Sequence, residues 1–297
     1  MVRIAHKPTF VSVEPAAVCQ LRCPECPVGQ EKVRGTKDAT SRLMPREIWQ
    51  RVLTQIAPFG HTIQFYFQGE PLLHQDLPQM IREAHEAGLY TIVSTNGQAM
   101  TPLMAEDLIR AGLNRIIVSM DGLTQETYGA YRVGGSLETT KKALTYLRAA
   151  KERLHGRTTI ELQCLRLKTN EDEWSAFKEQ YKSLGADKLV FKTAQLYNYR
   201  DGHPLMPTQE CYRRYTKGPD GHFHRKHLRR GCLRVWSGCV ITTSGEVLPC
   251  CYDKGRDYAY GNIMKTPIKE LFSNPQALAF RRAALNGRPN ICQECWK

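Results

Sequence analysis

The chain has 297 residues, of which 41% are hydrophobic and 24% are charged, with a formal net charge of +13. This length and apolar content are sufficient for one large α/β domain or two smaller ones without disulfide cross-links. No apolar stretch is long enough to span a membrane, and the first residues lack the apolar region of a signal peptide, so we expect a cytoplasmic protein. In that reducing setting, 11 cysteines are typical of thiolates that hold metal.

Short β-rich runs alternate with segments of helical periodicity through the first two thirds of the chain. The predicted strands are Thr9–Val13, Ile63–Phe67, Tyr90–Ser94, Arg115–Ser119, Thr159–Leu167 and Lys188–Lys192. The predicted helices are Pro45–Ile56, Leu77–Ala87, Pro102–Ala111, Leu137–Arg153 and Asp172–Leu184. Such a series of β/α units predicts a parallel sheet, which right-handed crossovers roll into a barrel or an open arc. Ligands of such sheets bind at the carboxyl ends of the strands.

Three cysteines, Cys19, Cys23 and Cys26, follow the first predicted strand and are separated by three and then two residues. A [4Fe–4S] cube and a structural zinc site both normally take four protein ligands. A loop that offers three thiolates therefore leaves one metal position open, where a small molecule can bind and react. The alternative is a zinc knuckle whose fourth ligand lies outside the motif.

Polar and glycine-rich turns follow the next three predicted strands. They are the segments 68–71 (Gln-Gly-Glu-Pro), 94–97 (Ser-Thr-Asn-Gly) and 119–122 (Ser-Met-Asp-Gly). In the first, glycine lets the backbone approach a ligand, and Glu70 and the carbonyl groups can accept hydrogen bonds from an ammonium group. Each turn alone is also explained by ordinary turn chemistry. Their occurrence on successive strands favours a binding site.

The three-cysteine loop and these turns together resemble the radical S-adenosylmethionine (SAM) superfamily. The resemblance implies a partial (β/α)6 barrel of the TIM type, and a [4Fe–4S] cluster that binds SAM and cleaves it to a 5'-deoxyadenosyl radical. It implies that residues 68–71 bind the amino group of SAM, and that Ser94 and Asn96 lie near the ribose. Ser119 and Arg132 become candidates for the SAM carboxylate. The implied cofactor-binding residues of the first turn are Gln68, Gly69, Glu70 and Pro71.

Two positions depart from the pattern of the superfamily. Gln68 stands where the first glycine of a Gly-Gly-Glu-Pro motif is usual, and Glu25 stands where many members have an aromatic residue before the third cysteine. Adenine stacking would then come from elsewhere. Leu165 is a candidate, because residues 161, 163, 165 and 167 share one face of their strand.

The last third of the chain contains a second cysteine set, Cys232, Cys250, Cys292 and Cys295. Two short strands, Val240–Thr243 and Glu246–Leu248, and two helices, Ile268–Phe272 and Pro275–Leu285, are predicted between these cysteines. The layout resembles a SPASM region in its shortened twitch form, which binds one auxiliary [4Fe–4S] cluster; a zinc ribbon is the alternative. A cluster with four thiolate ligands would accept or relay an electron, or brace the substrate pocket.

These patterns predict three regions: a radical SAM barrel over residues 1–193, a basic connection over 194–231, and an auxiliary cluster domain over 232–297. The basic run from Arg213 to Arg234 is either a solvated surface or a grip for phosphate or carboxylate, and no motif favours nucleic acid. Four cysteines are left over: Cys164, Cys211, Cys239 and Cys251. They are expected to be small buried residues. Cys211 is also a candidate hydrogen donor, since several radical epimerases of the superfamily place a thiol in this connection.

The sequence therefore predicts a radical SAM oxidoreductase, of the dehydrogenase or epimerase type, with SAM and two [4Fe–4S] clusters as cofactors. The cysteine layout resembles that of the twitch-bearing aminocyclitol dehydrogenases of the kind used in butirosin biosynthesis. This favours oxidation of a small, anionic, carbohydrate-like or nucleotide-linked substrate, with the auxiliary cluster as electron acceptor. The alternatives are an epimerase, a peptide-modifying maturase, and a non-enzymatic electron carrier or zinc module. The expected reducing partner is a flavodoxin or ferredoxin, and no membrane partner is expected.

Overall fold

The structure is a computed structural model that describes residues 7–30, 42–226, 232, 234–287, 289–293 and 295. The chain forms two compact units, each assembled from separate stretches of sequence. The first unit comprises residues 1–19, 32–93 and 228–297, and the second comprises residues 20–31 and 94–227.

The first unit contains a mixed sheet with strands in the order β11-β10-β9-β1-β2-β3. Strand β1 pairs in parallel with β2 on one side and with β9 on the other, and β2 pairs in parallel with β3. Strands β10 and β11 continue the sheet in antiparallel orientation. The strands are β1 (Phe10–Val13), β2 (Thr62–Phe65), β3 (Tyr90–Thr95, whose last two residues fall in the second unit), β9 (Gly238–Ile241), β10 (Glu246–Leu248) and β11 (Gly261–Asn262).

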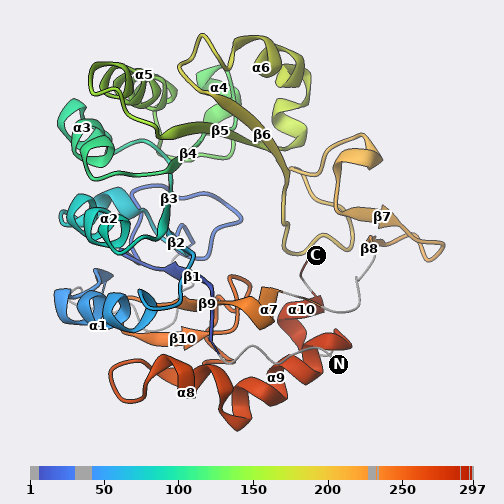
Figure 1. Ribbon diagram of the computed structural model, residues 1–297. Coiled ribbons are helices and arrows are strands. Elements are labelled where there is room, and N and C mark those ends of the chain that lie inside the picture. Colours follow the sequence, from blue (N-terminus) through green and yellow to red (C-terminus); the bar gives the residue numbers. More distant parts are fainter. Residues whose placement is uncertain are drawn as a thin grey trace. The chain divides into compact units, whose positions relative to one another are not determined.

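The helices of the first unit bury one apolar face each. In α1 the buried residues Trp49, Val52 and Ile56 recur at helical spacing, and α9 begins at a proline whose preceding residue, Asn274, caps the helix. Helices α8 and α9 pack together (Figure 1). The helices are α1 (Arg46–Ile56), α2 (Leu77–Glu86), α7 (Arg234–Ser237), α8 (Ile268–Ser273), α9 (Pro275–Leu285) and α10 (Asn290–Gln293), with a 3-10 turn η2 (Pro71–Leu73).

The second unit has a parallel sheet in which β5 pairs with β4 and with β6. Helices α3 and α5 pack side by side beside these strands (Figure 1). Thr101 and Ser136 cap the two helices with their side chains. The elements are α3 (Pro102–Arg110), β4 (Arg115–Ser119), α4 (Gln125–Gly129), α5 (Leu137–Arg153), β5 (Thr159–Arg166), η3 (Lys168–Glu173), α6 (Trp174–Gln180), β6 (Lys188–Thr193), η4 (Glu210–Tyr212), β7 (Tyr215–Lys217) and β8 (Phe223–Arg225).

The predicted α/β class is confirmed, because the six expected strands are present and every pair among β1–β3 and among β4–β6 is parallel. The predicted helix Asp172–Leu184 is wrong at both ends. A 3-10 turn, η3, precedes α6, and Asn170 of that turn donates its side-chain amide to the carbonyl of Asp121 at 2.9 Å. The connection 194–231, expected to be irregular, contains the antiparallel hairpin β7–β8.

Candidate active site

The loop after β1 carries the three predicted cluster cysteines. Cys19 is half-buried and ends the first stretch of the first unit, whereas Cys23 and Cys26 belong to the second unit. The backbone N–H of Cys26 donates to the carbonyl of Cys23 at 3.1 Å, so one turn carries both thiols. Burial raises the pKa of the Cys23 thiol, Arg132 opposes this rise, and Cys26 adds to it. Bound iron would favour the thiolate form of these ligands, because metal ligation deprotonates a thiol.

The turn after β2 packs against the backbone that leads to Cys19. Gly69 has a φ of +70°, and a Cβ atom there would lie 2.2 Å from the carbonyl oxygen of Ala16, so only glycine fits. The next N–H, that of Glu70, donates to the carbonyl of Val18 at 2.7 Å. The buried Glu70 carboxylate accepts a hydrogen bond from the N–H of Leu72 at 3.1 Å and caps η2.

Gln68 stands where the superfamily motif usually has glycine. Its side chain points toward the loop that contains the auxiliary Cys250. Its side-chain Nε2 donates to the carbonyl of Lys254 at 3.2 Å, and both residues belong to the first unit. Lys254 follows the adjacent cysteines at 250 and 251. This hydrogen bond joins the turn after β2 to the loop that follows β10.

A buried carboxylate, Glu14, lies directly after β1 in the same unit. Its Oε2 accepts a hydrogen bond from the N–H of Thr243 at 3.3 Å and lies 3.5 Å from Nη2 of Arg256. Its other oxygen, Oε1, is buried without a hydrogen-bond partner among the described residues. Burial raises the pKa of Glu14 to about 7, although Arg256 opposes the rise. Glu14 was not predicted from the sequence, although an acidic residue directly after an apolar strand was a visible signal.

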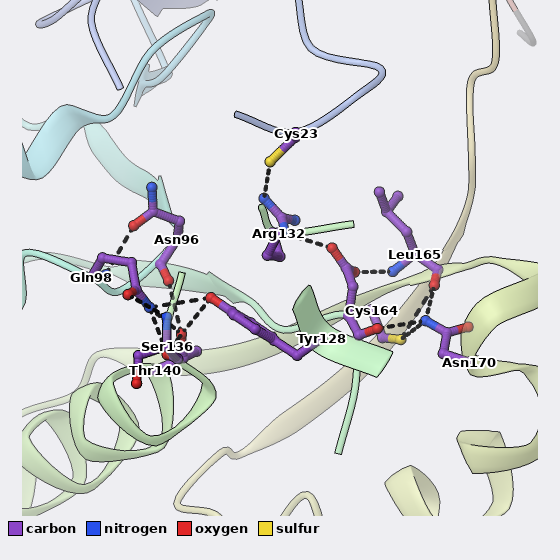
Figure 2. A network of polar contacts seen from close by, with 11 residues as sticks. Cys23, Asn96, Gln98, Tyr128, Arg132, Ser136, Thr140, Cys164, Leu165 and Asn170 are labelled. Atoms are coloured by element: carbon purple, nitrogen blue, oxygen red, sulfur yellow. Dashed lines mark hydrogen bonds and ion pairs between the residues drawn. The ribbon is translucent and has the colours of Figure 1, made fainter. Parts of the chain in front are cut away.

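The end of β3 leads into a polar network that Figure 2 shows in detail. Asn96 accepts a hydrogen bond through Oδ1 from the side chain of Gln20, next to Cys19 in sequence, at 3.3 Å. Gln98 donates to the hydroxyl groups of Tyr128 and Thr140 at 3.2 and 2.8 Å. Asn96 is buried and Ser94 half-buried. The network fixes the turn that carries the two predicted ribose residues.

The end of β4 carries an ion pair beside Cys23. Asp121 is fully buried, and its Oδ2 lies 2.6 Å from Nε of Arg132, whose Nη1 lies 4.0 Å from the Sγ of Cys23 (Figure 2). The other oxygen of Asp121 accepts a hydrogen bond from the N–H of Leu165 at 2.6 Å. Burial lowers the pKa of Arg132, but Asp121 and Cys23 outweigh burial and raise it overall. Arg132 is therefore a fixed positive charge next to a predicted cluster ligand.

The remaining predicted SAM residues are connected to Asp121, Ser119 through the chain and Leu165 through its backbone N–H. Ser119 is the buried last residue of β4, and Leu165 is half-buried near the end of β5. Asp121 was part of a recognised turn but was not assigned a role from sequence. Its aspartate-glycine step at a strand's carboxyl end was the signal that could have identified it.

Glu25, the residue found where an aromatic side chain is usual, is bound by the segment after β6. Its carboxylate accepts a hydrogen bond from the N–H of Tyr197 at 2.5 Å, and Nε2 of His203 lies 3.3 Å from its other oxygen. These contacts hold the cysteine turn of the second unit against residues 197–203. Glu25 therefore has a structural role that the sequence did not reveal.

In the first unit, Cys292 lies within electrostatic range of each of the other three auxiliary cysteines. Burial raises the pKa of Cys292 to about 11, and Cys295 and Cys232 add to the rise. Burial also raises the pKa of Cys250, with contributions from Cys251, Cys295 and Cys292. Among the described residues, no three metal-binding side chains have the arrangement of a preformed metal site. The donor set of four half-buried thiols nevertheless fits an iron–sulfur cluster chemically.

The leftover cysteines differ in burial. Cys164 and Cys239 are buried as expected, but Cys211 is exposed and Cys251 is half-buried, so the expectation of burial is wrong for these two. Cys211 lies in η4, which borders the hairpin β7–β8. The short polar 3-10 turn has no buried residue, which explains the exposure.

Two arginines of the basic run lie at the hairpin β7–β8, Arg225 within β8 and Arg213 two residues before β7. Tyr215 pairs with Arg225 and Lys217 with Phe223, and the guanidinium of Arg213 lies 5.2 Å from the centre of the Phe223 ring. Nε of Arg213 and both Nε and Nη1 of Arg225 are buried without a hydrogen-bond partner in the described part of the chain. Nη2 of Arg213 lies 4.0 Å from a carboxylate oxygen of Glu210, so the nitrogens without a partner are candidate ligands of a further carboxylate or phosphate group.

Two regions of the chain match models of known protein families. The model of the radical SAM superfamily matches residues 13–173, and that of an iron–sulfur cluster-binding domain, SPASM, matches residues 232–296. An AdoMet-dependent heme synthase of Methanosarcina barkeri (strain Fusaro / DSM 804) is 24% identical over 332 residues, which cover 99% of this chain and 90% of the relative. A PqqA peptide cyclase of Streptomyces rochei is 27% identical, with 97% of this chain and 81% of the relative covered.

Solved structures share the fold at low sequence identity. A structure of BtrN in complex with AdoMet and 2-DOIA has a TM-score of 0.59 and 18% identity, with 97% of this chain and 92% of that chain covered. A structure of anSMEcpe with bound AdoMet has a TM-score of 0.70 and 16% identity, with coverages of 97% and 85%. The predicted partial-barrel α/β fold class is thereby confirmed. None of the helices in the described part of the chain has the length and apolar character needed to cross a membrane.

Proposed function

Because the chain belongs to the radical SAM superfamily, we propose that it removes a hydrogen atom from a carbon of a small anionic substrate and then oxidises the substrate radical. The matched domains establish a radical SAM enzyme with SAM and iron–sulfur clusters as cofactors. A [4Fe–4S] cluster on three thiolates supplies an iron open to SAM and the electron that cleaves SAM to a 5'-deoxyadenosyl radical. The observation that carries the proposal is the presence of two cysteine sets, one with three thiols and one with four.

We assign the residues around the first set as follows. Cys19, Cys23 and Cys26 would hold the cluster. The backbone at Gly69 and Glu70 is the candidate partner of the SAM amino group, supported by a glycine position where a Cβ has no room. The candidate partners of the remaining groups of SAM are Arg132 and Ser119 for the carboxylate, Ser94 and Asn96 for the ribose, and Leu165 for the adenine.

The four auxiliary cysteines would leave no iron open to SAM, which favours electron transfer as the role of this set. Loss of a proton and of one electron from a substrate radical gives a two-electron-oxidised product. The three regions predicted from sequence, 1–193, 194–231 and 232–297, would then act in radical formation, substrate binding and electron transfer. A flavodoxin or ferredoxin as external donor and a cytoplasmic location belong to the same proposal.

The hairpin β7–β8 supports an anionic substrate. Arg213 and Arg225 have buried guanidinium nitrogens without hydrogen-bond partners among the described residues, and Arg213 contacts the ring of Phe223 in the same hairpin as Arg225. Guanidinium groups bind carboxylate and phosphate bidentately. A carboxylated or phosphorylated sugar, including a sugar nucleotide, has this chemistry.

A second candidate function is modification of a peptide. It is favoured by the relatives called PqqA peptide cyclases, and by the structural likeness to anSMEcpe with bound AdoMet and Cp18Cys peptide, which has a TM-score of 0.66. An epimerase that uses the exposed Cys211 thiol as hydrogen donor is a third candidate, and in the assay below it would give a product of unchanged mass.

The test is the substrate dependence of 5'-deoxyadenosine formation by the anaerobically reconstituted enzyme. Panels of anionic sugars and of peptides are compared, with product analysis by mass spectrometry. An anionic substrate should be oxidised, and the double variant Arg213→Gln/Arg225→Gln should raise its KM at least tenfold, since two charge-assisted contacts contribute about 1.5–3 kcal/mol each. Lys182→Gln, at an exposed lysine outside the hairpin, is the matched control. Turnover of peptides alone would favour the second candidate and contradict the first.

A further inference from the structure

Arg132 contacts a thiol of the cysteine turn in the second unit. Its Nη1 lies 4.0 Å from the Sγ atom of Cys23 (Figure 2). The backbone joins the same two segments, since the N–H of Arg22 donates to the carbonyl of Val133 at 2.9 Å. All four residues belong to the second unit. The cysteine turn and the segment of Arg132 are thus held together by a main-chain hydrogen bond as well as by the arginine side chain.

Asp121 fixes the direction of the Arg132 side chain. Its Oδ2 lies 2.6 Å from Nε of Arg132, and its carboxylate is fully buried, whereas 14% of the arginine side chain is exposed. Its Oδ1 accepts a hydrogen bond from the N–H of Leu165 at 2.6 Å, and neither oxygen is hydrogen-bonded to Cys23 in the described part of the chain. Because the guanidinium group is rigid and planar, a partner on Nε determines where Nη1 points.

Asn170 holds Asp121 in its position. This residue is 1% exposed, and its Nδ2 donates to the carbonyl groups of Asp121 and Leu165, each at 2.9 Å (Figure 2). Its Oδ1 accepts hydrogen bonds from the N–H of Leu167 at 3.1 Å and from Nε1 of Trp174 at 2.8 Å. A buried polar network whose members are hydrogen-bonded is rigid. The positive charge beside the cysteine turn is thus fixed by the ends of β4 and β5.

The surroundings of Cys23 suit a thiolate ligand of an iron–sulfur cluster. The side chain is buried, and an adjacent cation stabilises the thiolate form that metal ligation requires. A cluster with thiolate ligands carries a net negative charge, and reduction adds one more. Hydrogen bonds to the sulfurs and nearby charge set the potential of such a cluster. A cation at a ligand sulfur therefore stabilises the reduced form more than the oxidised form.

We propose that Asp121 is a positioning residue that directs Arg132 at the sulfur of Cys23, and that Arg132 thereby raises the reduction potential of the radical-generating cluster. This inference rests on the proposed assignment of Cys19, Cys23 and Cys26 as ligands. Nη2 of Arg132 has no hydrogen-bond partner among the described residues, which leaves it for the proposed contact with the SAM carboxylate. A less negative potential eases reduction of the cluster by an external donor.

The first experiment needs no substitution near this cluster. Protein labelled with ¹⁵N in arginine alone is reconstituted anaerobically in a Cys292→Ala/Cys295→Ala background, so that the cluster signal belongs to the first cysteine set. It is then reduced without SAM or substrate. Pulsed EPR spectroscopy should detect a ¹⁵N hyperfine coupling between an arginine nitrogen and the reduced cluster. A spectrum without arginine coupling would overturn the proposal.

The second experiment measures the midpoint potential in the same background by redox titration followed by EPR spectroscopy. Arg132→Gln/Asp121→Asn replaces both members of the buried pair, so neither is left as an uncompensated charge. Arg132→Lys keeps a cation for Asp121, but its single nitrogen replaces the two that bind Asp121 and Cys23. Arg148→Gln/Asp187→Asn removes another arginine–aspartate pair of the same unit, at 2.7 Å, and is the matched control.

The Arg132→Gln/Asp121→Asn variant should lose the ¹⁵N coupling. Its midpoint should become more negative by about 59 mV, which is a tenfold change in the equilibrium constant of one-electron reduction. Arg132→Lys should shift the midpoint in the same direction by a smaller amount, and it decides the question if the double variant does not bind iron. The control should match the background.

A midpoint that stays at or above the background value in both Arg132 variants, or an equal negative shift in the control, would refute the proposal. Both measurements are made without SAM, substrate or turnover. Failure of the proposed oxidation reaction would therefore leave them unchanged and would appear only in the product assay, so the two failures are distinguishable.

Discussion

The side-chain amide of Gln68 donates a hydrogen bond to the carbonyl of Lys254 at 3.2 Å. Gln68 departs from the glycine that is usual at this position of the superfamily motif. The departure gives the turn a side chain that reaches the loop after the auxiliary Cys250. We interpret Gln68 as a positioning residue that ties the candidate SAM turn to this loop.

Gln68→Ala should cost about 1 kcal/mol of folding free energy, the usual net contribution of one neutral hydrogen bond. It should also speed amide hydrogen exchange in residues 250–257, because the loop loses a tether. Hydrogen–deuterium exchange with mass spectrometry measures this effect, with the exposed Gln79→Ala as control. Unchanged exchange in that loop would show that the hydrogen bond does not hold it.

Asp121→Asn should destabilise the protein by about 3–5 kcal/mol, because it leaves the part-buried guanidinium of Arg132 without its charge partner. Thermal denaturation measures the loss. Asp187→Asn removes a more exposed partner of Arg148 and Lys151 and should cost only about 1 kcal/mol. Equal losses in the two variants would refute a special role for the buried pair.

Glu14 should make the protein less stable as the pH rises from about 4 to 7. Burial raises the pKa of its carboxyl group to about 7, whereas a glutamate of the unfolded chain has a pKa of about 4.3. Between these values the folded state holds a proton that the unfolded state has lost, so this contribution is present at low pH and is lost by about pH 7. The total is about 4 kcal/mol.

Glu14→Gln should remove most of that pH dependence, since an amide does not titrate. Unfolding at pH 5 and pH 8 is compared for the wild type and the variant. Glu246→Gln removes the other carboxylate that binds Arg256 and serves as control. The same loss of stability between the two pH values in wild type and Glu14→Gln would contradict the assignment.

Replacing Cys292 and Cys295 with alanine should lower the bound iron by about four per chain and leave SAM cleavage intact, since the two ligand sets do not overlap. Formation of the oxidised product should stop. Iron analysis and 5'-deoxyadenosine assays check both expectations, with Cys251→Ala as control. Loss of zinc at constant iron would show that the auxiliary set is a zinc site.

The strands and the strand-end turns could be predicted because their signals are local. β-branched runs mark β1–β6, and the polar turns at Asn96 and Asp121 follow β3 and β4 as expected. The parallel pairing of β9 with β1 has no local signal, because it joins segments from opposite ends of the chain. The contact of Arg256 with Glu14 depends on that pairing and was equally hidden.

Other features were missed for different reasons. The hairpin β7–β8 had a visible turn signal, Pro219-Asp220-Gly221, which the basic charge of the segment obscured. The burial of Arg281 could not be predicted, because an arginine on an amphipathic helix is normally exposed and only the packing of α9 buries it. The hydrogen bond from Gln68 to Lys254 could not be predicted either, because the two residues are far apart in sequence and only the fold brings them together.

The most direct test of the account is SAM cleavage by the wild type and by Cys19→Ala/Cys23→Ala/Cys26→Ala after anaerobic reconstitution. The wild type should bind about eight irons and release 5'-deoxyadenosine when reduced. The triple variant should bind about four irons and release no 5'-deoxyadenosine, because the auxiliary set offers no open iron. Formation of 5'-deoxyadenosine by the triple variant at the wild-type rate would contradict the assignment of the radical-generating site.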